Sequence, residues 1–280
     1  MILVTGATGN VGREVVKMLL DGGQKVAAVT RNPATAGLPA ASQVVGGNPS
    51  QPNTLKAALS GIEAIFLSPR ALGDAAAELL ALAAEQGVQR AVLLSGVTVE
   101  HGGGHRRFAD QFKAVEDAVK ASGLQWTFLR CADFASNTRV WAPQIRSNGV
   151  VRGAYGDAAT STIHERDIAA VGVRALVNPA HVGRSYVLTG PQSLTQRDKV
   201  RLIGEAIGKE LLWEEISPQQ VRQAMIARGV PEEVPDRMLG YLADCVQKPG
   251  PSSDTVEQVL GRPALTFAEW AVEHTADFRN

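Results

Sequence analysis

The chain has 280 residues, of which 45% are hydrophobic and 20% are charged, as is ordinary for a soluble globular protein. Its 28 basic residues balance its 28 acidic ones, so the zero formal charge gives no overall attraction to nucleic acid or to an anionic membrane. Two cysteines, Cys131 and Cys245, cannot form a disulfide framework, and no cluster of His and Cys suggests a metal site. The sequence shows no signal peptide and no apolar run of about 20 residues, so we expect a cytoplasmic protein.

Short apolar runs alternate with amphipathic stretches through the first half of the chain. Continuous apolar runs predict buried strands, and apolar residues at helical spacing predict helices that end at glycines. The predicted strands cover residues 1–4, 25–30, 43–45, 64–67, 91–94 and 125–129. The predicted helices cover residues 11–20, 54–59, 74–86 and 106–122. Strands that alternate with helices indicate an α/β protein with a doubly wound parallel sheet, the Rossmann fold, in which ligands bind beyond the carboxyl ends of the strands.

The pattern is less regular in the second half. We expect a helix at 166–177 and a strand at 185–188, and from residue 194 onward the chain is mainly helical and more polar. The sequence therefore predicts a cofactor-binding Rossmann domain at 1–132. It predicts a smaller, mainly helical substrate-binding lobe at 133–280, with part of 160–190 rejoining the Rossmann sheet.

A glycine-rich loop follows the first predicted strand and opens the first predicted helix. Its three glycines permit a tight turn, close approach of the backbone to a pyrophosphate, and close packing of the helix on the strand. The phosphates would meet free N–H groups at the start of the helix. The loop residues that we predict to bind a dinucleotide are Gly6, Thr8, Gly9, Asn10, Val11 and Gly12. The alternative is a glycine-rich turn that binds nothing.

The residues after the second predicted strand bear on the choice of cofactor. A carboxylate there would bind the 2′-hydroxyl of NAD, but residues 30–33 read TRNP and contain none. The guanidinium of Arg31 can instead hold a phosphate through two parallel hydrogen bonds. NADP is therefore favoured over NAD. The alternative is that Arg31 is solvated, or stacks on the adenine without discriminating between the cofactors.

The sequence resembles one branch of a known family. The spacing Gly-x-x-Gly-x-x-Gly is typical of extended and atypical short-chain dehydrogenase/reductases, and the string VTGATGNVGREVV at 4–16 closely resembles the NmrA-like atypical branch. Segments 48–67, 122–137 and 165–176 resemble later parts of the same family, in the same order. The branch includes type 2 NAD(P)H:quinone oxidoreductases, triphenylmethane-dye reductases, plant ether and lignan reductases, and catalytically silent NADP-sensing regulators.

The resemblance implies further contacts to the cofactor. It places Ser68, Pro69 and Arg70, after the fourth predicted strand, near the adenosine half. Residues from Cys131 to Phe134, after the sixth predicted strand, would pass along the nicotinamide. We therefore add the side chains of Cys131 and Phe134 to the predicted cofactor site.

The usual proton donor of this family is absent. Short-chain reductases generally use a Tyr four residues before a Lys, and no Tyr precedes Lys113 at that spacing. The resemblance to quinone and dye reductases implies a His-x-x-x-Glu at this level, where the chain has Phe112 and Glu116. We name Phe112 and Lys113 as candidate catalytic residues. Lys113 and Glu116 equally fit an exposed helix face, paired with Asp117 and Lys120.

Two other side chains are candidates for the chemistry. Ser95 ends the fifth predicted strand at a level where the resemblance implies a Ser or Thr that binds the nicotinamide, the ribose or a substrate oxygen, although a serine there can also simply cap a turn. His105 lies in the glycine-rich segment HGGGHR at 101–106 and would titrate near neutral pH, although an exposed loop explains the segment as well.

A quinone or a cationic dye needs little acid catalysis, since its own electron demand drives the reduction and water can protonate the product. The protein must stack such an acceptor on the nicotinamide, and the apolar Phe112 suits that task. We predict an NADPH-dependent oxidoreductase, a monomer or homodimer, that transfers hydride to a planar electron-poor acceptor such as an aromatic or quinone-like small molecule. We expect no nucleic-acid or membrane partner. The alternative is a catalytically silent NADP(H)-binding redox sensor that acts through partners.

Overall fold

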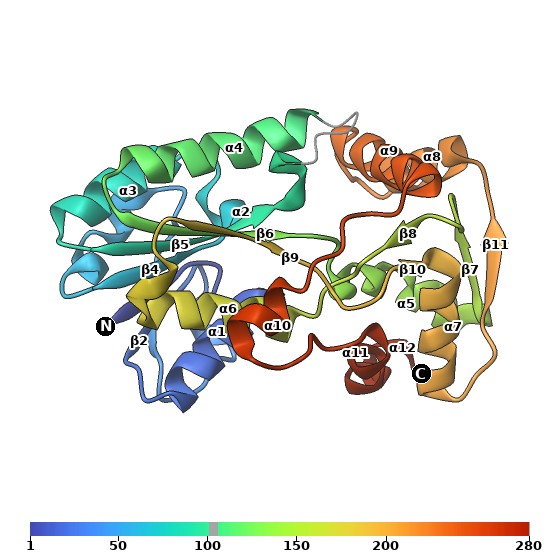
Figure 1. Ribbon diagram of the computed structural model, residues 1–280, viewed down its shortest axis with the longest axis horizontal. Helices are drawn as coiled ribbons and strands as arrows, with labels where there is room; N and C mark the ends of the chain where they lie inside the picture. Colours follow the sequence, from blue (N-terminus) through green and yellow to red (C-terminus); the bar gives the residue numbers. More distant parts are fainter. Residues whose placement is uncertain (101–105, 280) are drawn as a thin grey trace. The chain divides into compact units, whose positions relative to one another are not determined.

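Seven strands form one sheet, in the order β3-β2-β1-β4-β5-β6-β9 (Figure 1). The computed structural model describes residues 1–100 and 106–279. The neighbouring pairs from β3 to β6 are all parallel, and the register of β9 rises in the same direction as that of β6. The seven strands are β1 (Ile2–Val4), β2 (Val26–Thr30), β3 (Gln43–Gly46), β4 (Ala64–Leu67), β5 (Arg90–Gly96), β6 (Gln125–Cys131) and β9 (Arg184–Leu188). This sheet confirms the predicted Rossmann fold.

Helices cover both faces of the sheet, as Figure 1 shows. Helices α1 and α6 pack against each other on one face, where a Cβ atom at Gly172 would lie 3.2 Å from Leu129 and Phe66. On the other face, a buried core joins the strands to α3 and α4 through residues such as Leu79 and Val119. The helices of this part are α1 (Asn10–Asp21), α2 (Pro69–Leu72), α3 (Ala76–Glu85), α4 (Arg106–Ala121) and α6 (Glu165–Val177). The short 3₁₀ helices are η1 (Pro33–Thr35), η2 (Pro52–Leu55), η3 (Ala57–Leu59), η4 (Val97–Val99) and η6 (Pro179–His181).

The predicted helix at 54–59 is wrong, because this segment forms the two short 3₁₀ helices η2 and η3. Pro52 starts the first of them, and the Thr54 hydroxyl donates to the carbonyl oxygen of Gln51 at 2.8 Å. Side chains that bond to nearby backbone in this way compete with the hydrogen bonds of an α-helix. The segment is also too short to gain much from helix propagation.

The chain divides into two compact units. Unit 1 comprises Met1–Val99, Ala109–Cys131 and Glu165–Val187, and unit 2 comprises Glu100–Phe108, Ala132–His164 and Leu188–Asn280. Unit 1 holds the large sheet and the helices that cover it. Within the described ranges, no helix is long and apolar enough to cross a membrane.

Unit 2 contains two small sheets and several helices. Strand β7 (Val150–Gly153) pairs in parallel with β11 (Leu212–Glu215), and β8 (Ala159–Thr160) pairs antiparallel with β10 (Leu194–Thr195). Trp270 is fully buried and stacks on Phe267 at 5.4 Å between ring centroids. The helices are η5 (Ala135–Trp141), α5 (Ala142–Asn148), α7 (Gln196–Ile207), α8 (Pro218–Ala227), α9 (Glu233–Gln247), α10 (Thr255–Leu260), α11 (Phe267–Glu273) and α12 (Thr275–Phe278).

Candidate functional site

The loop between β1 and α1 has a backbone that three glycines make possible. Gly6 has φ +62°, and a Cβ atom there would lie 2.8 Å from the Cβ of Ser68. A Cβ at Gly12 would lie 2.1 Å from the carbonyl oxygen of Gly6, so the helix can approach the turn only without a side chain. A Cβ at Gly9 would meet that same oxygen at 3.2 Å and otherwise open space. The result is an open cradle lined by backbone over the first turn of α1, as a pyrophosphate requires.

The ends of β1 and β4 are tied together beside this cradle. Thr5 is fully buried, and its hydroxyl donates to the carbonyl oxygen of Phe66 at 3.0 Å and accepts from the N–H of Ser68 at 2.9 Å. Strand order reverses between β1 and β4, which is where doubly wound sheets bind their ligands. Pro69 begins helix α2 directly after Ser68, and the side chain of Arg70 is exposed. The structure thus places Ser68 next to the glycine loop. The role of Thr5 was not predicted from the sequence.

Helix α1 starts without a side-chain cap. Its N-cap residue is Gly9, which has no side chain to accept from the first-turn N–H groups, and Gly9 and Asn10 are both exposed. The positive end of the helix dipole therefore faces the cradle, where an anion is stabilised. The residues present fit a dinucleotide pyrophosphate.

Arg31 lies directly after β2 and is exposed. No hydrogen bond or ion pair to its guanidinium occurs within the described part of the chain. Residues 31–37 read RNPATAG and contain no carboxylate that would compete for the guanidinium or favour NAD. The side chain is therefore available to bind a phosphate from solution.

A buried polar network lies at the carboxyl end of β5. The Ser95 hydroxyl donates to Oε1 of Glu116 at 2.7 Å, and Arg130 donates to the same carboxylate through Nε at 3.0 Å and Nη2 at 2.7 Å. Glu116 is 1% exposed and Ser95 is 3% exposed. The exposed-face interpretation of Glu116 is therefore wrong. Its place on the apolar stripe of α4, four residues after Phe112 and three before Val119, was the signal that could have shown this.

Phe112 and Lys113 have different surroundings on α4. The ring of Phe112 covers Gly96 at the end of β5, where an added Cβ would lie 2.7 Å from the ring. Lys113 is on the exposed side of the helix and pairs with Asp117, as the exposed-face interpretation expects. The structure thus groups Ser95 and Phe112 near the same strand end and leaves Lys113 in solvent.

Three predicted site residues remain, namely Cys131, Phe134 and His105. Cys131 ends β6 and is buried, and burial raises the pKa of its thiol, so it stays protonated and is not a nucleophile. Phe134 belongs to unit 2 and forms an isolated bridge with Ile163. His105 lies outside the described residues.

A second polar cluster occurs in unit 2, next to the segment that follows β6. Lys199 is fully buried and donates to Oδ2 of Asp133 at 3.0 Å, and it also contacts the hydroxyl of Thr160. Asn137 donates to Oδ1 of Asp133 at 2.9 Å. Burial raises the pKa of the Asp133 carboxyl, but Lys199 and these hydrogen bonds outweigh burial and leave the pKa below its ordinary value. The cluster fixes the segment after β6 within unit 2.

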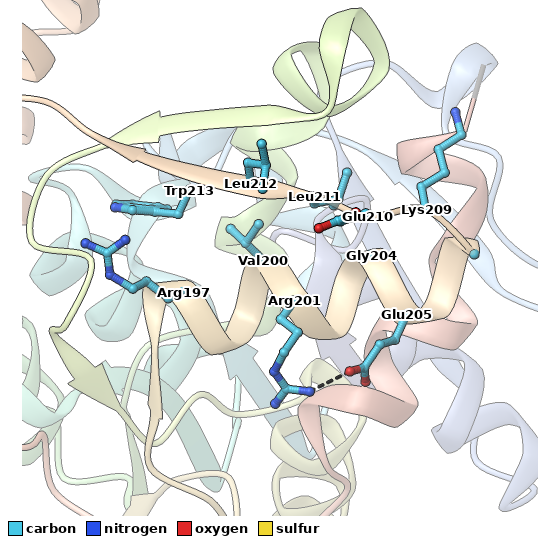
Figure 2. A pocket seen from close by; sticks show the side chains of 11 residues that line it. Arg197, Val200, Arg201, Gly204, Glu205, Lys209, Glu210, Leu211, Leu212 and Trp213 are labelled. Carbon is cyan, nitrogen blue, oxygen red and sulfur yellow. Dashed lines mark hydrogen bonds and ion pairs between the residues drawn. The ribbon is translucent and has the colours of Figure 1, made fainter.

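An open groove of about 640 Å³ lies between α7 and β11 in unit 2 (Figure 2). Leu211, Leu212 and Trp213 form its apolar side. On the other side Arg201 bonds to Glu205 at 2.6 Å, so these two charges largely satisfy each other. The charged side chains that line the groove, such as Lys209 and Glu210, are exposed, and we assign the groove no catalytic role.

Comparison with known proteins defines the class. Residues 6–179 match a family described as NAD(P)H-binding. The chain is 38% identical to (4-alkanoyl-5-oxo-2,5-dihydrofuran-3-yl)methyl phosphate reductase of Streptomyces griseus and 35% identical to NAD(P)H azoreductase of Xenophilus azovorans, with 99% of each chain covered in both cases. Its structure is similar to an NADPH-dependent quinone oxidoreductase of Escherichia coli solved with NADPH, with TM-score 0.82, 26% identity, and 98% and 99% of the two chains covered.

The chain therefore belongs to the NAD(P)H-binding family and is an NAD(P)H-dependent oxidoreductase. The resemblance to the NmrA-like atypical short-chain dehydrogenase/reductases is confirmed.

Proposed function

We propose that the protein transfers hydride from NADPH to a planar, electron-poor conjugated acceptor such as a quinone. The observation that carries this proposal is the composition of the site at the end of β5. Phe112 covers Gly96, the Ser95 hydroxyl is bonded to Glu116, and α4 (Arg106–Ala121) contains no Tyr. Among the residues that the structure describes, such a site offers an apolar surface and no evident acid, which suits an acceptor that does not need protonation during hydride transfer.

The names of the relatives support this class of substrate. A dihydrofuranone phosphate, an azo compound and a quinone share a conjugated π system with an electronegative atom that receives the negative charge. For these acceptors the main task of the protein is to hold donor and acceptor in contact. We infer a small-molecule substrate of this kind for the present chain.

The cofactor, when bound, supplies the hydride. We propose that the glycine loop from Gly6 to Gly12, including Thr8, Asn10 and Val11, holds the pyrophosphate and that Arg31 binds the 2′-phosphate. Ser68, Pro69 and Arg70 would line the adenosine half, and Cys131 and Phe134 would border the nicotinamide. In this account residues 1–132 bind the cofactor and 133–280 bind the substrate, with part of 160–190 in the sheet.

Ser95 has a defined hydrogen-bonding role in this proposal. Its hydroxyl proton is directed to Glu116, and Arg130 holds that carboxylate in place. The Ser95 oxygen therefore faces a ligand as an acceptor and not as a proton donor. The proton of the product then comes from water or from His105. The proposal gives no role to Lys113.

A comparison of acceptors tests the proposed function. The purified protein is mixed with NADPH and a naphthoquinone, an azo dye, a butenolide or an unactivated cyclic ketone, and the loss of NADPH absorbance is followed. We expect kcat/KM for at least one conjugated acceptor to exceed that for the ketone by roughly 10²-fold or more, the usual contribution of a general acid. Rapid ketone reduction would contradict the absence of an acid. Tight NADPH binding without turnover of any acceptor would favour a redox sensor.

A further inference from the structure

We propose that Arg13 is a positioning residue for the 2′-phosphate of NADPH, because it ties the loop that begins at Arg31 to the glycine loop. The inference rests on the proposed binding of that phosphate by Arg31. Arg13 itself is the residue directly after Gly12 in α1.

Three N–H groups of Arg13 bond to three main-chain carbonyl oxygens. Nε donates to Thr8 at 3.0 Å, Nη1 donates to Gly37 at 2.8 Å, and Nη2 donates to Ala36 at 2.8 Å. Thr8 belongs to the glycine loop, whereas Ala36 and Gly37 follow η1 within the loop that joins β2 to β3. One planar guanidinium thus joins the two loops that the proposal assigns to the pyrophosphate and to the 2′-phosphate.

The loop after β2 has supports within itself, because in and after η1 the N–H groups of Thr35 and Ala36 donate to Asn32 and Pro33 at 3.3 Å, and Ala36 is buried. At its start the N–H of Asn32 donates to the Thr30 hydroxyl at 3.2 Å, and Pro33 lies against Gly46, where an added Cβ would be 3.1 Å away. Midway along the loop Gly37 has φ +56°, and the bonds from Arg13 hold it and Ala36. The bonds from Arg13 join this stretch to α1, so without them the loop that begins at Arg31 is held less firmly relative to α1. Ordering it again on binding would cost conformational entropy.

The proposal predicts an effect on NADPH that NADH does not share. A lysine keeps the positive charge of Arg13, but its single ammonium group cannot reproduce a planar fork that bonds three carbonyl oxygens. We expect Arg13→Lys to raise the Kd of NADPH about tenfold, which corresponds to about 1.4 kcal/mol, and to leave the Kd of NADH within about threefold.

The experiment measures both dissociation constants by calorimetry at fixed ionic strength. The variants are Arg13→Lys, Arg13→Ala, Arg31→Ala and the double variant Arg13→Lys/Arg31→Ala. Arg90→Lys is the matched control, because Arg90 also bonds to a carbonyl oxygen, that of Leu176 at 2.6 Å, but at the opposite end of the strands. We expect this control to leave both constants unchanged. In the Arg31→Ala background, Arg13→Lys should no longer weaken NADPH selectively, since the two residues act together.

Three outcomes would overturn the inference. They are an equal loss of affinity for both cofactors, full retention of NADPH affinity in Arg13→Lys with loss in Arg13→Ala, and a selective effect of Arg13→Lys that persists without Arg31. Failure of the proposed function is a separate result: an unchanged cofactor preference in Arg31→Ala contradicts the assignment of the 2′-phosphate to Arg31 itself. If Arg31→Ala changes the ratio of the two dissociation constants and Arg13→Lys does not, only the inference about Arg13 is overturned.

Discussion

Two arginines close in sequence to the glycine loop and to β2 differ in what their guanidinium groups contact. The guanidinium of Arg13 donates three hydrogen bonds to main-chain carbonyl oxygens. The guanidinium of Arg31 is exposed and has no partner among the residues described. A guanidinium already engaged by the backbone positions other groups, and a free one binds an incoming anion. The position of Arg31 after a predicted strand made it a candidate phosphate ligand from the sequence alone. The contacts of Arg13 could not be predicted, because they involve a loop more than 20 residues away.

Substitution of Arg31 tests the choice of cofactor. If Arg31 binds the 2′-phosphate as proposed, Arg31→Asp would remove a charge-assisted contact of about 1.5–3 kcal/mol, repel the phosphate and offer a carboxylate to the ribose of NADH. We expect the ratio of the two dissociation constants to move toward NADH by at least about tenfold. The glycine loop is untouched, so NADH should still bind. An unchanged ratio would leave Arg31 as a solvated residue and make Arg70 the next candidate.

Helix α4 carries two ion pairs with opposite surroundings. Lys113 and Asp117 pair in solvent, with side chains 61% and 52% exposed, whereas Glu116 pairs with Arg130 in the interior, with side chains 2% and 12% exposed. Exposed pairs contribute little to stability, but loss of one partner from a buried pair leaves an uncompensated charge. The buried pair also connects α4 to β6 and orients Ser95 at the end of β5.

Truncation of each pair on this one helix gives a direct comparison. We expect Glu116→Ala to lower the free energy of unfolding by about 3–5 kcal/mol, because it removes the buried carboxylate that pairs with the Arg130 guanidinium. The control Lys113→Ala should change the free energy of unfolding by about 1 kcal/mol or less. Denaturant unfolding measures both, and Glu116→Gln serves if the alanine variant does not fold. Equal effects at the two positions would show that Glu116 is not buried as described.

Across the whole molecule, the parts predicted from sequence are those with local signals. The glycine loop, the apolar strands and the helix ends each depend on neighbouring residues, and the seven-stranded sheet follows from their alternation. The pairs Glu116–Arg130 and Lys199–Asp133 join residues that are distant or lie in different elements, so composition and spacing did not show them. In both cases, however, one charged residue stands on the apolar face of an amphipathic helix, and that position was a usable signal.

The strands of unit 2 were missed for a different reason. β7 and β11 have four residues each and β8 and β10 have two, which is too short for a pattern of alternation to emerge. The lobe that we predict to bind substrate shows no sequence motif, because its core forms by packing of residues from several elements around Trp270 and not from one continuous segment. The substrate must therefore be found by measurement.

We propose that hydride passes from NADPH directly to a conjugated acceptor on this protein. The most direct test is a single turnover without oxygen, in which the protein with one equivalent of NADPH is mixed rapidly with the best acceptor from the comparison. We predict that the NADPH absorbance is lost in one step, and that this step is slower when both hydrogens at C4 of the nicotinamide are deuterium. A cofactor that stays reduced in the presence of every conjugated acceptor, or a loss of absorbance at the same rate without the protein, would contradict the account.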